Sequence, residues 1–170
     1  MPYPVQQDSQ EIARSRQVAA AVELVAVRLT QASFCLSVEP DVIKPPLRIQ
    51  IRVGSRSRPR KKSSFSVEAN LRLKATDASG KQAPTLELEC AYLATYSLSA
   101  DVDIRAIRAF SRGNAVFNCW PYFREFVQDV CGRVGLPALT LPLFKMQVVD
   151  KKRRGRHPTK SRTGAPQGRT

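Results

Sequence analysis

The chain has 170 residues, 42% of them apolar, and its 28 Lys and Arg against 14 Asp and Glu give a net charge of +14. This length suits one domain with a sizeable core. Nowhere do about 18 apolar residues run together, so no membrane-spanning helix is expected. The first residues lack the basic start and apolar run of a secretory signal, and no phosphate-binding loop of the GxxxxGK type occurs.

The positive charge is confined to two segments. Residues 44–62 contain eight basic residues and no acidic one, and residues 151–170 contain another eight, again without an acid. Removing these sixteen leaves 12 basic residues against 14 acidic ones, a net of −2, so the rest of the chain is nearly neutral. The candidate electrostatic contacts are Arg56, Arg58, Arg60, Lys61, Lys62, Lys151, Lys152, Arg153 and Arg154.

Two interpretations of these basic segments stay open. They can bind phosphate backbones of RNA, DNA or the ribosome through non-specific electrostatics, which would make the protein a nucleic-acid or ribosome-associated adaptor. They can equally be solvated extensions that keep the protein soluble or contact acidic partners. Neither segment interleaves aromatic residues for base stacking, so sequence-specific recognition of single strands is disfavoured.

Four cysteines, Cys35, Cys90, Cys119 and Cys131, show no CxxC spacing and sit within apolar patterns. We expect reduced, buried thiols in a cytoplasmic protein. The only histidine, His157, lies in the basic tail, so no metal site is predicted. No cofactor is expected either.

The N-terminal half predicts one helix and then four strands. Asp8 and Ser9 can cap a short helix over residues 9–21. A long strand starts at Val22, with a bulge or bend near Thr30 and Gln31, and prolines end it. Strict alternation of apolar and polar residues then predicts strands over residues 47–53, 65–74 and 86–98. A flexible basic loop over 54–63 and a hairpin loop over 77–81 join them.

The C-terminal half predicts two helices. The first covers residues 101–113, and the second has Asn118 as its cap and Pro121 in its first turn. Gly135 and Pro137 stop the second helix, whose apolar face is formed by Phe123, Phe126, Val127, Val130 and Val134. Strands followed by helices indicate an α+β fold, a four-stranded antiparallel sheet with C-terminal helices packed on one face.

Two motifs stand out in this half, Trp120-Pro121-Tyr122-Phe123-Arg124-Glu125 and residues 133–141. The first resembles the F-P-Y-x-R-E helix start of the SecB family of protein-export chaperones. The second resembles the family's R-G-x-P-x-L-x-L element, with one residue inserted before Gly135. The resemblance covers about residues 22–146. It divides the chain into an N-terminal helix or extension (1–21), a SecB-like chaperone domain (22–148) and a basic disordered tail (149–170).

The resemblance implies an ATP-independent chaperone that binds unfolded or nascent polypeptides in apolar grooves and assembles as a homotetramer, a dimer of dimers. Both preprotein export and a dedicated client, such as an antitoxin, stay open. Residues 30–35 lack the two carboxylates with which export members help to dock SecA, and Glu89 alone keeps a third acidic position. With a basic tail as well, docking to SecA is expected to be weak.

The candidate groove residues are Phe34, Leu36, Phe117, Trp120 and Phe123. The alternative for the aromatic residues of the helix is that they anchor it in the core against the sheet, or against a neighbouring subunit. The family motif helix contributes Pro121, Tyr122, Arg124 and Glu125, and Arg124 is expected to pair across a subunit interface. Arg124 and Glu125 are accompanied by no nucleophile, so no catalytic residue and no enzymatic activity are predicted.

Overall fold

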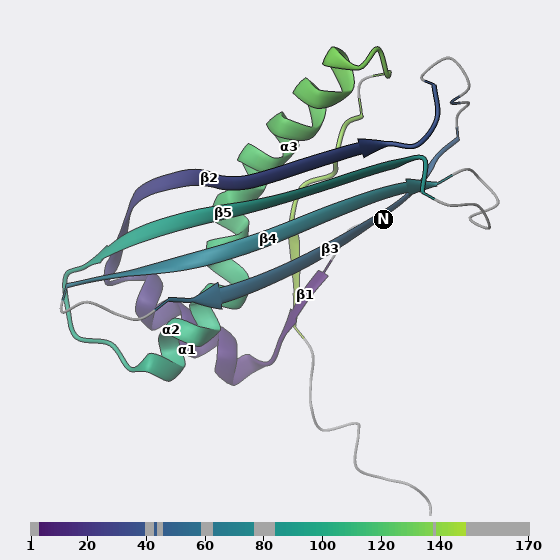
Figure 1. Ribbon diagram of the computed structural model, residues 1–170. Coiled ribbons are helices and arrows are strands. Elements are labelled where there is room, and N and C mark those ends of the chain that lie inside the picture. The colour runs from purple at the N-terminus through teal and green to yellow at the C-terminus, as the bar shows by residue number, and fades with distance from the viewer. Residues whose placement is uncertain are drawn as a thin grey trace, which may run out of the picture.

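Figure 1 shows the computed structural model, which describes residues 4–39, 43, 46–58, 63–76, 84–137 and 139–148. The predicted hairpin loop over 77–81, the basic residues Arg60, Lys61 and Lys62, and the tail from Lys151 onward lie outside the described residues. The elements are β1 (Pro4–Gln7), α1 (Ser9–Ala19), β2 (Val22–Leu36), β3 (Arg48–Ser57), β4 (Ser64–Thr76), β5 (Leu86–Leu98), α2 (Ile104–Phe110), the π-helical turn η2 (Ser111–Ala115), α3 (Val116–Arg133) and β6 (Lys145–Val148).

The predicted four-stranded antiparallel sheet is confirmed, with strand order β2-β5-β4-β3. The helices lie on one face of it, behind the sheet in Figure 1. Alternate residues of β4 and β5 are buried against the helices, as their period of two requires. β2 is shifted in register between Leu29 and Gln31, which confirms the predicted bulge, and a second shift lies between Leu24 and Ala26.

β3 is longer than its apolar pattern predicted. Residues 54–57, expected to open the basic loop, continue β3 and pair in register with β4 as far as Ser57 opposite Val67. The pairing partner extends the strand here, because ladder hydrogen bonds form regardless of the polar side chains. Arg56 therefore belongs to the sheet, while Arg58, just beyond the strand, still donates its N–H to the Ser66 carbonyl at 2.8 Å.

The predicted break between the two C-terminal helices is wrong. α2 runs through η2 into α3, so Asn118 and Pro121 lie inside α3 and not at its start. Burial of Cys119, Trp120 and Phe123 in the core holds this stretch helical despite the missing proline N–H. The Asn118 side chain does not cap the helix as predicted, and its Nδ2 donates to the Tyr96 hydroxyl at 3.1 Å.

The core lies between the inner face of the sheet and the helices. The predicted apolar face of α3 packs there, and an aromatic cluster joins β4, β5 and α2, with ring centroids 5.1 Å apart for Phe65 and Tyr96 and again for Tyr96 and Phe110. No helix among the described residues combines the length and apolar character needed to cross a bilayer.

The N-terminal segment packs against the rest of the protein at two places. Asp8 caps α1 in a reciprocal capping box with Glu11, and the helix ends at Ala19, two residues before the predicted end. β1, which the sequence did not predict, pairs in parallel with β6. Buried Gln7 donates from Nε2 to the Ala109 carbonyl at 2.8 Å, which ties this pair of strands to α2.

Candidate functional site

A groove follows the open edge of the sheet along β3. One hollow of about 690 Å³ is lined by Leu47, by residues 48–52 of β3 and by Thr140, Leu141 and Pro142. A second, of about 450 Å³, is lined by Val5, Arg112, Val116 and residues 51 and 53–55 of β3. The two hollows share Ile51 and together follow residues 47–55, a stretch about 30 Å long at the rise of an extended strand.

The backbone of β3 faces this groove. β3 is the last strand of the sheet, so one side of its backbone has no neighbouring strand. Because Arg58 bonds to Ser66 on β4 and the register is unbroken from Arg48 to Ser57, the N–H and C=O groups of Ile51, Val53 and Ser55 point to the open edge. No backbone group of another described segment bonds to these three residues.

The two faces of β3 differ sharply in chemistry. Leu47, Ile49, Ile51 and Val53 face inward and form the apolar floor of the groove. Arg48, Arg52 and Arg56 face outward, and all three are exposed. No carboxylate among the described residues forms an ion pair with any of them.

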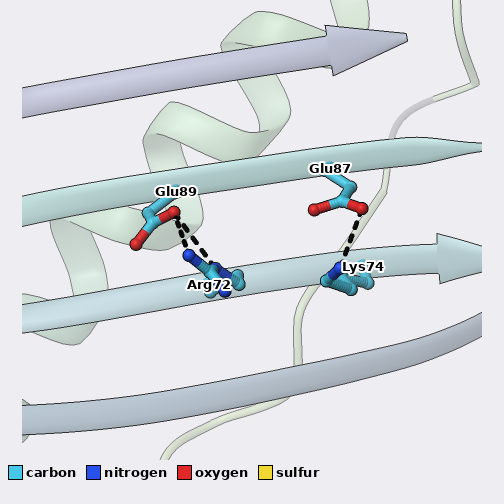
Figure 2. Close-up of polar contacts among 4 residues, drawn as sticks. All are labelled: Arg72, Lys74, Glu87 and Glu89. Atoms are coloured by element: carbon cyan, nitrogen blue, oxygen red, sulfur yellow. Dashed lines mark hydrogen bonds and ion pairs between the residues drawn. The ribbon is translucent and has the colours of Figure 1, made fainter. Parts of the chain in front are cut away.

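The outward carboxylates of β4 and β5 are bound to other cations. Figure 2 shows Glu89 of β5 accepting two hydrogen bonds from Arg72 of β4, one from Nε at 3.1 Å, and Glu87 accepting from Lys74 at 2.8 Å. Glu68 pairs with Arg58 at 2.6 Å, and this hydrogen bond is the main cause that lowers the pKa of Glu68. The outer face is therefore neutral in its middle and positive along β3.

The second SecB-like motif builds the other wall of the groove. Gly135, with φ of 73°, ends α3 by letting the Leu136 N–H return to the Cys131 carbonyl at 2.9 Å. The chain beyond then runs beside β3. It also borders a small apolar hollow of about 190 Å³, which is lined by Ile43, Leu47, Ile49, Leu86, Cys131, Leu136, Pro137 and Leu139.

Trp120 holds this wall in place from inside the core. Its Nε1 donates to the Pro142 carbonyl at 2.9 Å, and its ring lies 5.5 Å from that of Phe144. Trp120 is 3% exposed and Phe123 is fully buried, so neither of these predicted groove residues faces the groove in this chain. Both occupy the core position that was the alternative.

The remaining predicted groove residues lie apart from β3. Phe34 is exposed and Leu36 half-buried on β2, at the opposite edge of the sheet. Phe117 is exposed on α3, with its ring 6.3 Å from Phe144. Sequence reasoning missed Ile51, Val53 and Leu141 as groove residues. The alternation around Ile51 and Val53 predicted the inward face of a strand, but only the strand order shows that β3 is an edge strand.

The residues of the motif helix are placed in two environments. Pro121 and Glu125 are exposed, and Tyr122 is half-exposed with its ring 6.4 Å from Tyr92 of β5. Arg124 is half-buried, and its Nε is buried without a hydrogen-bond partner among the described residues. A buried donor of this kind suits an acceptor from another chain.

The prediction of four buried thiols is wrong for one cysteine. All four are free, but Cys35 is exposed on β2 because the outer edge of that strand is uncovered. Burial raises the pKa of Cys90 to about 11 and that of Cys119 to about 12. These thiols are therefore packing groups in their neutral form and not nucleophiles.

Comparison with solved structures identifies the fold. The SecB-like chaperone of Mycobacterium tuberculosis, solved in complex with a ChAD peptide from the HigA1 antitoxin, matches with a TM-score of 0.68 over 79% of this chain and 99% of its own. The chain has a SecB-like fold. The SecB-like resemblance of the two motifs is thereby confirmed at the level of the fold, at a sequence identity of 21%.

A protein of unknown function from Streptococcus agalactiae matches less well, with a TM-score of 0.46, 11% identity and coverage of 72% of this chain and 97% of its own. No protein-family model matches the chain, and no curated protein matches it. The SecB-like fold therefore rests on the tertiary structure and on the two motifs.

Proposed function

We propose that this protein is an ATP-independent SecB-like chaperone that holds non-native polypeptide segments in the groove along β3. The observation that carries the proposal is the groove itself, which follows residues 47–55 over an apolar floor. It lies beside a strand edge where the backbone groups of Ile51, Val53 and Ser55 have no strand partner among the described residues. An unfolded segment offers the matching features, which are an extended backbone and scattered apolar side chains. The SecB-like fold and the antitoxin peptide bound by its structural neighbour support the same function.

A dedicated client is favoured over SecA-dependent export. Export members are expected to present free carboxylates on the outer face of the sheet, where attraction to SecA depends on charge complementarity. Here Glu89 is bound by Arg72 and Glu87 by Lys74, and β3 adds outward arginines that form no ion pair within the described part of the chain. We therefore propose a cytoplasmic chaperone with its own client, which includes the possibility of an antitoxin, and little or no contact with SecA.

The proposed assembly is a homotetramer, a dimer of dimers. The second edge strand, β2, exposes Leu24, Leu29 and Phe34 on its helix-side face, where the helices do not cover it. Apolar side chains on an uncovered strand edge suit burial by another copy of the chain. The partnerless Nε of Arg124 would find its acceptor in such an interface.

The function is tested with a permanently unfolded, fluorescently labelled client, using light scattering after size-exclusion chromatography together with an aggregation assay. We expect a tetramer that carries the client and slows aggregation of a chemically unfolded substrate at stoichiometric amounts. Val53→Glu places a charge on the groove floor and should abolish both effects. Ile104→Glu, at an exposed site on α2, is the matched control and should retain them. A chain that neither binds the client nor slows aggregation contradicts the proposal.

A further inference from the structure

The edge of β3 combines three features that together define which segment it can bind. Its backbone groups at Ile51, Val53 and Ser55 lack strand partners, its inward side chains are apolar, and its outward side chains at positions 48, 52 and 56 are arginines. A strand added to such an edge is held by backbone hydrogen bonds, and its side chains alternate between the two faces.

We propose that the client binds as a fifth strand on β3 and that the preferred segment alternates apolar with acidic residues. This inference rests on the proposed function. The apolar side chains of the added strand enter the groove beside Ile51, Val53 and Leu141. Its carboxylates lie on the outer face beside Arg52 and Arg56, since residues paired across strands share a face.

The arrangement of charge around β3 argues for an incoming acid. The outward acids of β4 and β5 are already bound by Arg58, Arg72 and Lys74, so within the described residues none forms an ion pair with Arg52. Arg56 shares Glu68 with Arg58, because it lies directly opposite that carboxylate. Arginines along an edge also repel the same edge of another copy, which hinders pairing of β3 with itself. A strand of opposite sign meets no such repulsion.

The absence of aromatic residues on this face favours a peptide over a nucleic acid. The outward residues of β3 are Arg48, Gln50, Arg52, Gly54 and Arg56, which offer no ring for base stacking. A phosphate backbone would use the arginines but neither the apolar floor nor the free N–H and C=O groups of the edge. An acidic amphipathic strand uses all three.

The test is fluorescence anisotropy with labelled nine-residue peptides that alternate valine with glutamate, glutamine or lysine. We expect the glutamate peptide to bind roughly tenfold more tightly than the glutamine peptide, as two or three exposed charge pairs allow. The lysine peptide should bind more weakly still. In the Arg52→Glu, Arg56→Glu double variant this order should reverse. The control variant Arg14→Glu, at an exposed position on α1, should leave the order unchanged.

Backbone pairing is tested separately by N-methylating the glutamate peptide at alternate residues. Methylation of the alternate residues whose N–H groups point to β3 should abolish binding, while methylation of the residues between them should be tolerated. If both methylated peptides bind equally well, strand addition is wrong. A second result also overturns it: a short RNA of the same charge displaces the glutamate peptide equally well, and RNA binding is unchanged in Val53→Glu. β3 would then be a general polyanion surface.

The failure of this inference is distinguishable from failure of the proposed function. If the unfolded client binds the wild-type protein and Val53→Glu abolishes that binding, but the glutamate peptide has no advantage over the lysine peptide, the chaperone groove stands and the acidic selectivity is wrong. If neither the unfolded client nor any peptide binds, the proposed function is wrong and the inference falls with it.

Discussion

Arg52 on β3 and Arg72 on β4 lie directly opposite one another across the outer face of the sheet. Arg72 is held by Glu89 on its other side, so Arg52 faces a cation whose counter-charge is already bound. Like charges directly opposite on neighbouring strands destabilise a sheet. We therefore expect the position of Arg52 to cost stability in the isolated chain, as a residue that serves a partner would.

The first prediction follows from this pair. Arg52→Thr removes the repulsion and places a β-favouring residue on β3, so the free energy of unfolding should rise by about 0.5 kcal/mol. Urea unfolding followed by circular dichroism measures it. Arg72→Thr is the control, because it leaves Glu89 without its partner and should give no such gain. A loss of stability in Arg52→Thr would show that Arg52 stabilises the fold.

The second prediction concerns the wall of the groove. Trp120→Phe removes the hydrogen bond to the Pro142 carbonyl and part of the contact with Phe144. We expect a loss of about 1–3 kcal/mol in unfolding free energy. Hydrogen exchange in residues 139–144 should also become faster. Tyr122→Phe, half-exposed on the same helix, should change stability by less than about 0.5 kcal/mol. Unchanged exchange in the wall would mean that the indole does not hold it.

The third prediction concerns the contact of β1 and β6 with the π-helical turn. A Cβ at Gly113 would lie 2.9 Å from both Gln7 Oε1 and Met146 Sδ. Gly113→Ala should therefore push the two strands away and cost about 1–3 kcal/mol. Limited proteolysis should then cut near β1 or β6.

Gly132 provides the matched control for this substitution. A Cβ there would meet nothing within 4 Å, and the residue lies in the last turn of α3. Gly132→Ala should keep the native proteolysis pattern and gain a few tenths of a kcal/mol, at most about 1. Identical behaviour of the two variants would show that the N-terminal strand is not seated on Gly113.

The fourth prediction concerns alkaline pH. Burial raises the pKa of Cys119 from 9.0 to about 12, so the folded state holds its proton at pH values where the unfolded thiol has lost it. The stabilising contribution is fully present below about pH 9 and is lost as the pH rises toward 12. Burial raises the pKa of Tyr96 from 10.0 to about 12, which adds a loss of the same sign at higher pH.

This loss is measured from urea midpoints between pH 7 and pH 11. The midpoint should fall above pH 9 in the wild-type chain. Cys119→Ala lowers stability at every pH through the cavity it creates, but its midpoint should fall less steeply between pH 9 and pH 10. Cys35→Ser, at the exposed thiol, should follow the wild-type slope. Parallel slopes for wild type and Cys119→Ala would contradict the assignment.

Much of the fold follows from local patterns. The alternation in β4 and β5 is set by one buried and one wet face, and the apolar spacing from Phe123 to Val134 requires one helix face against a sheet. These patterns, with the two motifs, were sufficient to predict an α+β fold resembling SecB. The bulge near Thr30 was also visible, because the apolar pattern changes face there.

Local sequence patterns did not determine the candidate site. Strand order is a property of the whole chain, so β3 could not be recognised as an edge from residues 47–57 alone. Trp120 and Phe117 are both aromatic residues of one helix, yet one is 3% exposed and the other 53%, because the helix faces the core only on one side. The Asn118 and Pro121 signals for a helix start were overridden by burial of the residues around them.

The sequence by itself determined the types of the four sheet strands and of α1 and α3, the two faces of β3, β4 and β5, and the excess of positive charge, since these depend on neighbours a few residues apart. Only the tertiary structure decided where that charge is neutralised. Arg58, Arg72 and Lys74 meet their carboxylates across 10, 17 and 13 residues of sequence. Arg52 lies opposite another arginine, and Arg56 lies opposite Glu68, which already pairs with Arg58. Those pairings depend on strand order and register, which place distant residues side by side.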